Sequence, residues 1–147
     1  MTRTQQFALY AAEETCPRGE EFATLTQLDE WVRARVLDAP WFHERFPRVD
    51  AVSVHGRPAG VHDSVGGYFA DTRSGQIEMA RSHWCARDVC HELAHVVASP
   101  QGGHGHDPCF VRCYLTLVYL TQGSEAYVLL RTALLDAGIV IDERDDV

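Results

Sequence analysis

The chain has 147 residues, which is enough for one domain with a proper core and too few to expect two. Hydrophobic residues make up 46% and charged residues 23%, as in an ordinary soluble globular protein. The formal net charge of −8 argues against a general binding surface for nucleic acids or anionic membranes. No apolar run approaches the length of a membrane span. Because Met1 to Gln6 contain no hydrophobic signal region, we expect a cytoplasmic protein.

The first third of the chain shows one clear helical pattern. Residues 1–23 are expected to be largely irregular, with a short strand or a helical turn from Phe7 to Ala12. An apolar stripe from Thr24 to Leu37 predicts a helix capped by Thr24 or Thr26. Pro40 and Pro47 then bracket what is expected to be another helical turn.

Three strand-like segments follow, at Val49 to Val54, Gly67 to Asp71 and Gln76 to Ala80. The last two flank a predicted hairpin turn at Thr72 to Gly75, so we expect a small antiparallel sheet. Between the first strand and the hairpin, residues 56–66 are rich in glycine and contain proline, which indicates a loop.

The segment His91-Glu92-Leu93-Ala94-His95 carries the strongest chemical signal. Histidines four residues apart on a helix project from one face, so both imidazoles can reach one metal ion. Neutral imidazole suits Zn²⁺, and a catalytic zinc site takes three protein ligands and leaves a position for water. Glu92 can then act as the base that accepts a proton from the zinc-bound water. We expect this helix to begin near a Ser82 cap and to end at about Ala98.

The segment after the motif helix offers a third ligand. Glycines at 102, 103 and 105 allow the chain to double back, and Asp107-Pro108 is a favourable start for another helix. His106 precedes that start and is the preferred third ligand, with His104 and Glu125 as alternatives. Gly123 is expected to end this helix, and Ser124 to cap a last one that closes at Gly138. Residues 142–147 are expected to be irregular.

With both motifs placed, the chain resembles the SprT-like group of minimal HExxH zincins and the small metallohydrolases near it. In that group a His-Gly-Pro-x-Phe segment supplies the third zinc ligand, and His106-Asp107-Pro108-Cys109-Phe110 matches at the histidine, proline and phenylalanine. The resemblance covers roughly residues 49–121 and implies that an upstream strand binds extended substrate at its edge. The group's DNA-repair role does not carry over, because this acidic chain has no basic extension.

We therefore expect an α+β, zincin-like single domain spanning residues 1–147, with the small antiparallel sheet packed against the HExxH helix and further helices behind. The predicted function is zinc-dependent hydrolysis, most simply of a peptide bond, with His91, His95 and His106 as ligands of one zinc and Glu92 as the catalytic residue. The expected partner is a peptide or protein substrate, with neither nucleic acid nor membrane. Hydrolysis of a non-peptide substrate and a non-catalytic, zinc-stapled binding module are the alternatives.

For the other titratable residues, the neighbouring sequence does not indicate a single role. Asp88 lies one turn before His91 and Glu92 and can orient either of them, or stand in solvent at a helix terminus. Any of several scattered residues can stabilise an oxyanion: His43, His55, His62, His83 and Tyr68. The cysteines are odd in number and have no Cys-x-x-Cys spacing, so we expect all of them to be reduced and none to be essential to the metal site: Cys16, Cys85, Cys90, Cys109 and Cys113.

Overall fold

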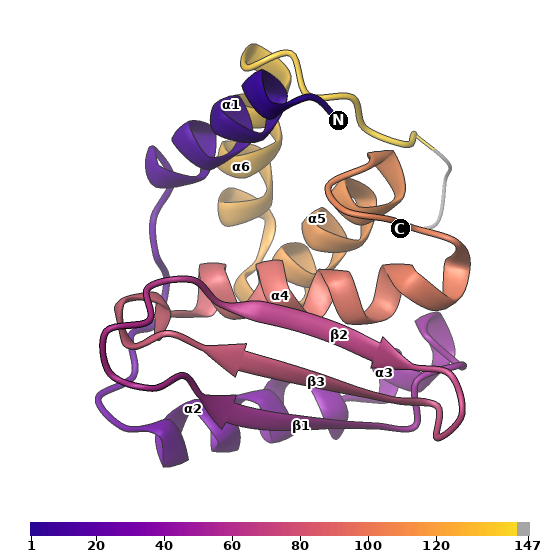
Figure 1. Cartoon of the computed structure of the whole chain (residues 1–147). Helices are drawn as coiled ribbons and strands as arrows, with labels where there is room; N and C mark the ends of the chain where they lie inside the picture. The colour runs from indigo at the N-terminus through magenta and orange to yellow at the C-terminus, as the bar shows by residue number, and fades with distance from the viewer. Residues whose placement is uncertain (144–147) are drawn as a thin grey trace.

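The computed structural model describes residues 1–143 and has an α+β architecture with a small three-stranded sheet (Figure 1). Its strands are β1 (Ala51–Gly56), β2 (Val65–Phe69) and β3 (Ser74–Met79). Each begins within two residues of its predicted start. The expected antiparallel sheet is wrong in one respect, because β1 runs parallel to β3 and only β2 is antiparallel to it. The strand order β1-β3-β2 makes the sheet mixed.

One face of the sheet is buried against helices. In β3 the buried residues alternate with partly exposed ones, so Gly75, Ile77 and Met79 face inwards. The motif helix α4 (Ala86–Ala98) packs under β2 and β3, and α2 (Leu25–Val32) packs beside β1. The helices behind α4 are α1 (Arg3–Glu14), α5 (Pro108–Gln122) and α6 (Ser124–Asp136), and Figure 1 shows α4 lying between them and the sheet.

The helix starts follow local chemistry that was only partly predicted. Thr24 caps α2, and α2 continues through a π-helical turn (Arg33–Leu37) towards α3 (Pro40–Arg45). Asp107 caps α5 as expected, accepting a hydrogen bond from the backbone N–H of Phe110. The predicted caps at Ser82 and Ser124 are wrong. Ser82 lies in a separate 3-10 turn (Arg81–His83), α4 starts after Cys85, and Ser124 is already inside α6 after Gly123.

The largest departure is α1, in a region expected to be irregular. Thr2 and Gln5 form a reciprocal capping box, in which the Thr2 hydroxyl accepts from the Gln5 N–H and the Gln5 side chain accepts from the Thr2 N–H. Leu9, Ala12 and Glu13 turn inwards from this helix. Residues 142 and 143 are irregular as expected, and 144–147 lie outside the described residues.

All five cysteines lie in the described part of the chain and are free thiols, as predicted. Within residues 1–143, no helix combines the length and the apolar character needed to cross a membrane.

Strand β2 approaches α4 at unusually close range. A Cβ atom built on Gly66 would overlap the backbone carbonyl oxygen of Glu92, so only glycine fits at this contact. The next residue, Gly67, has no atom within 4 Å of the same position. Gly66 therefore sets how closely the edge of the sheet lies to the motif helix.

Gly66→Ala is expected to lower the free energy of unfolding by about 1–3 kcal/mol, the usual cost of overpacking a rigid contact. Gly67→Ala on the same strand is the matched control and should change it by less than about 0.5 kcal/mol. Urea denaturation followed by circular dichroism measures both. Equal effects in the two variants would contradict the close-approach explanation.

Candidate metal centre

The three predicted histidine ligands come together at one point. His91 and His95 project from one face of α4, and His106 meets them from the loop that precedes α5. One ligating atom from each residue lies within 4.8 Å of the others. Nε2 of His91 and Nε2 of His106 are 3.1 Å apart, close to the roughly 3.3 Å that separates two nitrogens on a tetrahedral zinc. The cluster can therefore hold a metal ion.

The loop that carries His106 is held by backbone and side-chain hydrogen bonds. Gly102 adopts a positive φ of 90°, and the N–H of Gly103 donates to the carbonyl of Ala98 at the end of α4. The two carboxylate oxygens of Asp107 then accept from the N–H groups of His104 and Phe110, both at 2.9 Å. Asp107 thus fixes the residue before it, so that His106 reaches the cluster with a defined backbone.

The alternative third ligands lie elsewhere. His104 is exposed in the same loop, and Glu125 is exposed in the first turn of α6. Neither belongs to the three-histidine cluster. The structure therefore favours His106 as the third member of the cluster, as predicted from the rigid junction between the loop and α5.

A carboxylate that the sequence did not single out contacts the first histidine. Glu13, at the end of α1, is buried with 6% of its surface exposed, and its carboxylate lies 3.0 Å from Nδ1 of His91. The Tyr114 hydroxyl also donates to this carboxylate, at 3.2 Å. Because an ionised carboxylate only accepts, it favours a proton on Nδ1 and leaves the Nε2 lone pair of His91 facing the other histidines. This donor arrangement fits a metal ion.

Asp88, which was expected to orient His91 or Glu92 or to lie in solvent, pairs with an arginine instead. It pairs with Arg87 at 2.8 Å, and Arg87 also donates to the backbone carbonyls of Glu13 and Cys16, both at 3.0 Å. Within residues 1–143 the Asp88 carboxylate accepts no hydrogen bond from the side chain of His91 or of Glu92. Asp88 therefore acts one step away, since its arginine holds the end of α1 where Glu13 meets His91.

The surroundings shift the pKa values of the three clustered histidines in different directions. Burial lowers the pKa of His95 to about 3 and that of His106 to about 4, with the neighbouring His91 adding to both effects. Burial also acts to lower the pKa of His91, but the carboxylates of Glu13, Glu92 and Asp88 together outweigh it, with Glu13 contributing most, and the pKa lies above its usual value. Two imidazoles are thus kept in the neutral form that ligates metal, while His91 is the one that takes up a proton.

Glu92 points towards the same region and has the environment of a base. Its carboxylate lies 3.9 Å from Nε2 of His91, and the side chain is largely buried. Desolvation raises its pKa to about 7, with the carboxylates of Glu13, Asp88 and Asp63 adding to the rise and His91 opposing it. A carboxylate of this kind can exchange a proton near neutral pH.

A cavity of about 740 Å³ opens over the cluster. It is lined by His91, Glu92 and His95 of α4, by His106, and by Tyr10 of α1. Residues 62–64 and 82–83 complete this part of the lining. Tyr10 packs with its ring centroid 5.5 Å from that of His106. Among the scattered candidates, His62 and His83 line this cavity, whereas His43, His55 and Tyr68 do not. The Tyr68 hydroxyl instead donates to the Arg48 carbonyl.

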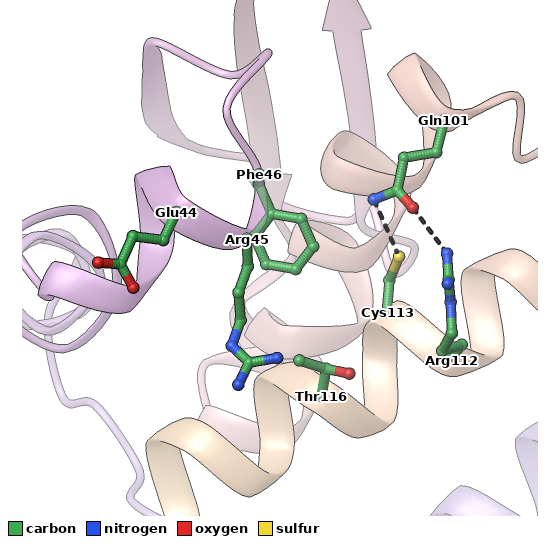
Figure 2. A pocket seen from close by; sticks show the side chains of 7 residues that line it. All are labelled: Glu44, Arg45, Phe46, Gln101, Arg112, Cys113 and Thr116. Carbon is green, nitrogen blue, oxygen red and sulfur yellow. Dashed lines mark hydrogen bonds between the residues drawn. The ribbon is translucent and has the colours of Figure 1, made fainter. Parts of the chain in front are cut away.

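A smaller cavity, of about 340 Å³, lies between α3 and α5 (Figure 2). There the Gln101 side chain bridges two residues of α5, accepting from Arg112 at 2.7 Å and donating to the sulfur of Cys113. The clustered histidines are absent from its lining, which consists of Glu44, Arg45, Phe46, Gln101, Arg112, Cys113 and Thr116. We therefore place the candidate site in the larger cavity.

Comparison with known protein families, with curated proteins and with solved structures finds no match to this chain.

Glu13→Gln is expected to weaken zinc binding by about 10–100-fold, the usual effect of removing a carboxylate behind a histidine ligand. Glu14→Gln, at the exposed neighbouring position, is the control and should bind zinc as the wild type does. Competition with a chromophoric chelator at constant pH measures both affinities. Unchanged affinity in Glu13→Gln, with the fold intact, would show that the carboxylate does not support His91.

Zinc affinity is also expected to fall as the pH drops through 6.5. The pKa of His91 lies above this value, so its imidazole is protonated first and can no longer ligate, whereas His95 and His106 stay neutral down to about pH 4. One proton should therefore compete with the metal, giving about a tenfold loss of affinity per pH unit between pH 6 and 5. Zinc titrations over this pH range measure the affinity, and circular dichroism checks that the fold stays intact. A constant affinity, or a loss of about a thousandfold per pH unit as for three competing protons, would contradict the prediction.

Proposed function

We propose that this chain is a zinc-dependent hydrolase, and specifically a metallopeptidase of the HExxH type that its two motifs resemble. The observation that carries the proposal is the convergence of three imidazoles and one carboxylate of raised pKa in the lining of an open cavity. A group of this composition joins metal ligands to a general base, which is what hydrolysis of an unactivated carbonyl compound requires.

Zinc is the proposed metal because its borderline character suits a set of three imidazole nitrogens. When bound, it supplies a Lewis acid that polarises the substrate carbonyl and makes a water molecule acidic at neutral pH. His91, His95 and His106 would hold it, and the Glu13 carboxylate would keep the ring of His91 turned with Nε2 towards the metal.

Glu92 is the proposed general base. As water attacks the scissile carbonyl carbon, the Glu92 carboxylate takes the proton that the water loses, and it then delivers that proton to the leaving amine. Burial aids both halves of this task, because a pKa near 7 allows the same group to accept and to release a proton close to neutral pH.

Strand β2 supports a peptide as the substrate. It is an edge strand, paired with β3 on one side and with no other strand of the described residues on its outer side. The Gly66 contact brings β2 against the backbone of Glu92, so this edge lies near the proposed base. An extended peptide can add to such an edge through backbone hydrogen bonds, with its side chains alternating between two faces.

A non-catalytic, zinc-stapled module is the less favourable alternative. A structural zinc site normally closes its coordination with a fourth protein ligand. The cluster in the described residues has three, and it lies at a cavity large enough for a substrate. A carboxylate of raised pKa beside the ligands also has no purpose in a purely structural site.

Glu92→Gln is expected to keep zinc and fold while lowering the hydrolysis of a peptide panel by roughly two to four orders of magnitude. Metal content by mass spectrometry and initial rates by chromatography measure the two properties. His106→Ala should lose the metal, and His104→Ala, in the same loop, should keep it.

Loss of zinc in Glu92→Gln would make Glu92 a ligand and overturn the assignment. A zinc-loaded wild-type protein that hydrolyses amides but no peptide would favour the non-peptide reading. One that hydrolyses nothing would favour the binding module.

A further inference from the structure

The lining of the large cavity includes a hydrogen-bonded pair, Ser64 and His83. The Ser64 hydroxyl oxygen lies 2.9 Å from Nδ1 of His83, and both residues line the cavity that contains Glu92. Ser64 ends the loop before β2, and His83 ends the turn before α4. The pair therefore joins two segments that line the cavity.

The hydrogen-bond partners of Ser64 indicate which of the two residues donates in this pair. Its hydroxyl oxygen accepts the backbone N–H of Ala80 at 2.9 Å. Within residues 1–143 the only other partner of this hydroxyl is Nδ1 of His83, so the hydroxyl proton finds an acceptor only if Nδ1 accepts it. We assign the donor on this ground, because it gives both the hydroxyl proton and the Nδ1 lone pair a partner. The ring proton of His83 resides on Nε2, at the opposite edge of the imidazole. In residues 1–143 that nitrogen has no hydrogen-bond partner, so it is available to a ligand in the cavity.

The other strong donors of the cavity are engaged. Arg87 donates to Asp88 and to two backbone carbonyls, and Arg18 donates to Glu21 and to the Ser82 carbonyl. Two rivals remain, and no hydrogen bond within residues 1–143 fixes either of them: His62, two residues before Ser64, and Tyr10, on α1. Tyr10 packs against the rings of His91 and His106, and its hydroxyl, unlike the His83 ring, is not held by a hydrogen bond to another part of the site. A donor is more effective when its direction is fixed before the substrate arrives.

We propose that His83 is a catalytic residue that donates its Nε2–H to the oxyanion formed during hydrolysis, and that Ser64 is the positioning residue that holds it in this tautomer. The proposal rests on the proposed function. When water attacks the carbonyl carbon, the π electrons of the C=O bond move to its oxygen, and Glu92 takes the proton of the water. His83 keeps its own proton throughout and contributes a hydrogen bond that strengthens as negative charge develops.

The decisive experiment compares kcat and KM of zinc-loaded His83→Ala and His83→Gln with the wild type on a cleaved peptide. Loss of one oxyanion donor should lower kcat of His83→Ala by about 10²–10³-fold, with KM within threefold and zinc content unchanged. Glutamine retains an N–H donor and should recover part of the loss. His55→Ala, on the exposed outer face of the sheet, is the control for removing a histidine.

Two measurements do not depend on turnover. ¹⁵N NMR of the histidine rings should find the proton of His83 on Nε2 in the wild type and a mixture of tautomers in Ser64→Ala. A peptide phosphonate, whose oxygens mimic the oxyanion, should bind zinc-loaded His83→Ala about 30–100-fold more weakly than the wild type.

A proton on Nδ1, normal kcat in His83→Ala, or a change in KM alone would overturn the proposal. So would a loss of kcat in Tyr10→Phe without one in His83→Ala. These outcomes differ from failure of the proposed function, in which the zinc-loaded wild type itself hydrolyses nothing. That result would remove the catalytic role of His83 together with the reaction.

Discussion

The contact between Glu13 and His91 is the interaction on which the site depends. A carboxylate and an imidazole are both expensive to bury alone, and each of these side chains is more than nine-tenths buried. Their 3.0 Å contact, together with the Tyr114 hydroxyl, makes the burial acceptable by giving each group a partner. It also joins α1 to α4, two helices whose contacting residues lie 78 positions apart in the chain. The orientation of the first histidine is thus a tertiary property rather than one of the motif helix.

Local chemistry in the sequence accounts for much of the site. The spacing of His91 and His95 placed both on one helical face, and the Asp107-Pro108 start placed His106 at a rigid junction. Both inferences needed only helix geometry and capping rules, which act within a few residues. The free state of the cysteines followed from their number and spacing in the same way.

Features that depend on contacts between residues far apart in the chain were not predicted from the sequence. Glu13 lies in a segment that was expected to be irregular, and nothing near it in the sequence indicates that its carboxylate contacts His91. Its helix was itself detectable, since Thr2 and Gln5 have the spacing of a capping box. The parallel pairing of β1 with β3 was not, because strand order depends on where the hairpin docks rather than on the strand residues. The pairing of Asp88 with Arg87 was not predicted either, since Arg87 is held in place by two backbone carbonyls at and beyond the end of α1.

The capping box at Thr2 starts α1, the helix whose Glu13 contacts the histidine cluster. The motif resemblance spans roughly residues 49–121, and a fragment cut to those limits would retain all three clustered histidines and Glu92. It would lack α1, and with it the acceptor that holds Nδ1 of His91. The imidazole would then be free to exchange its two nitrogens by rotating about its side-chain bonds, and Tyr114 would lose its acceptor. Domain boundaries drawn from the motif alone would exclude the helix that orients His91, so any excised version needs the chain from its first residues.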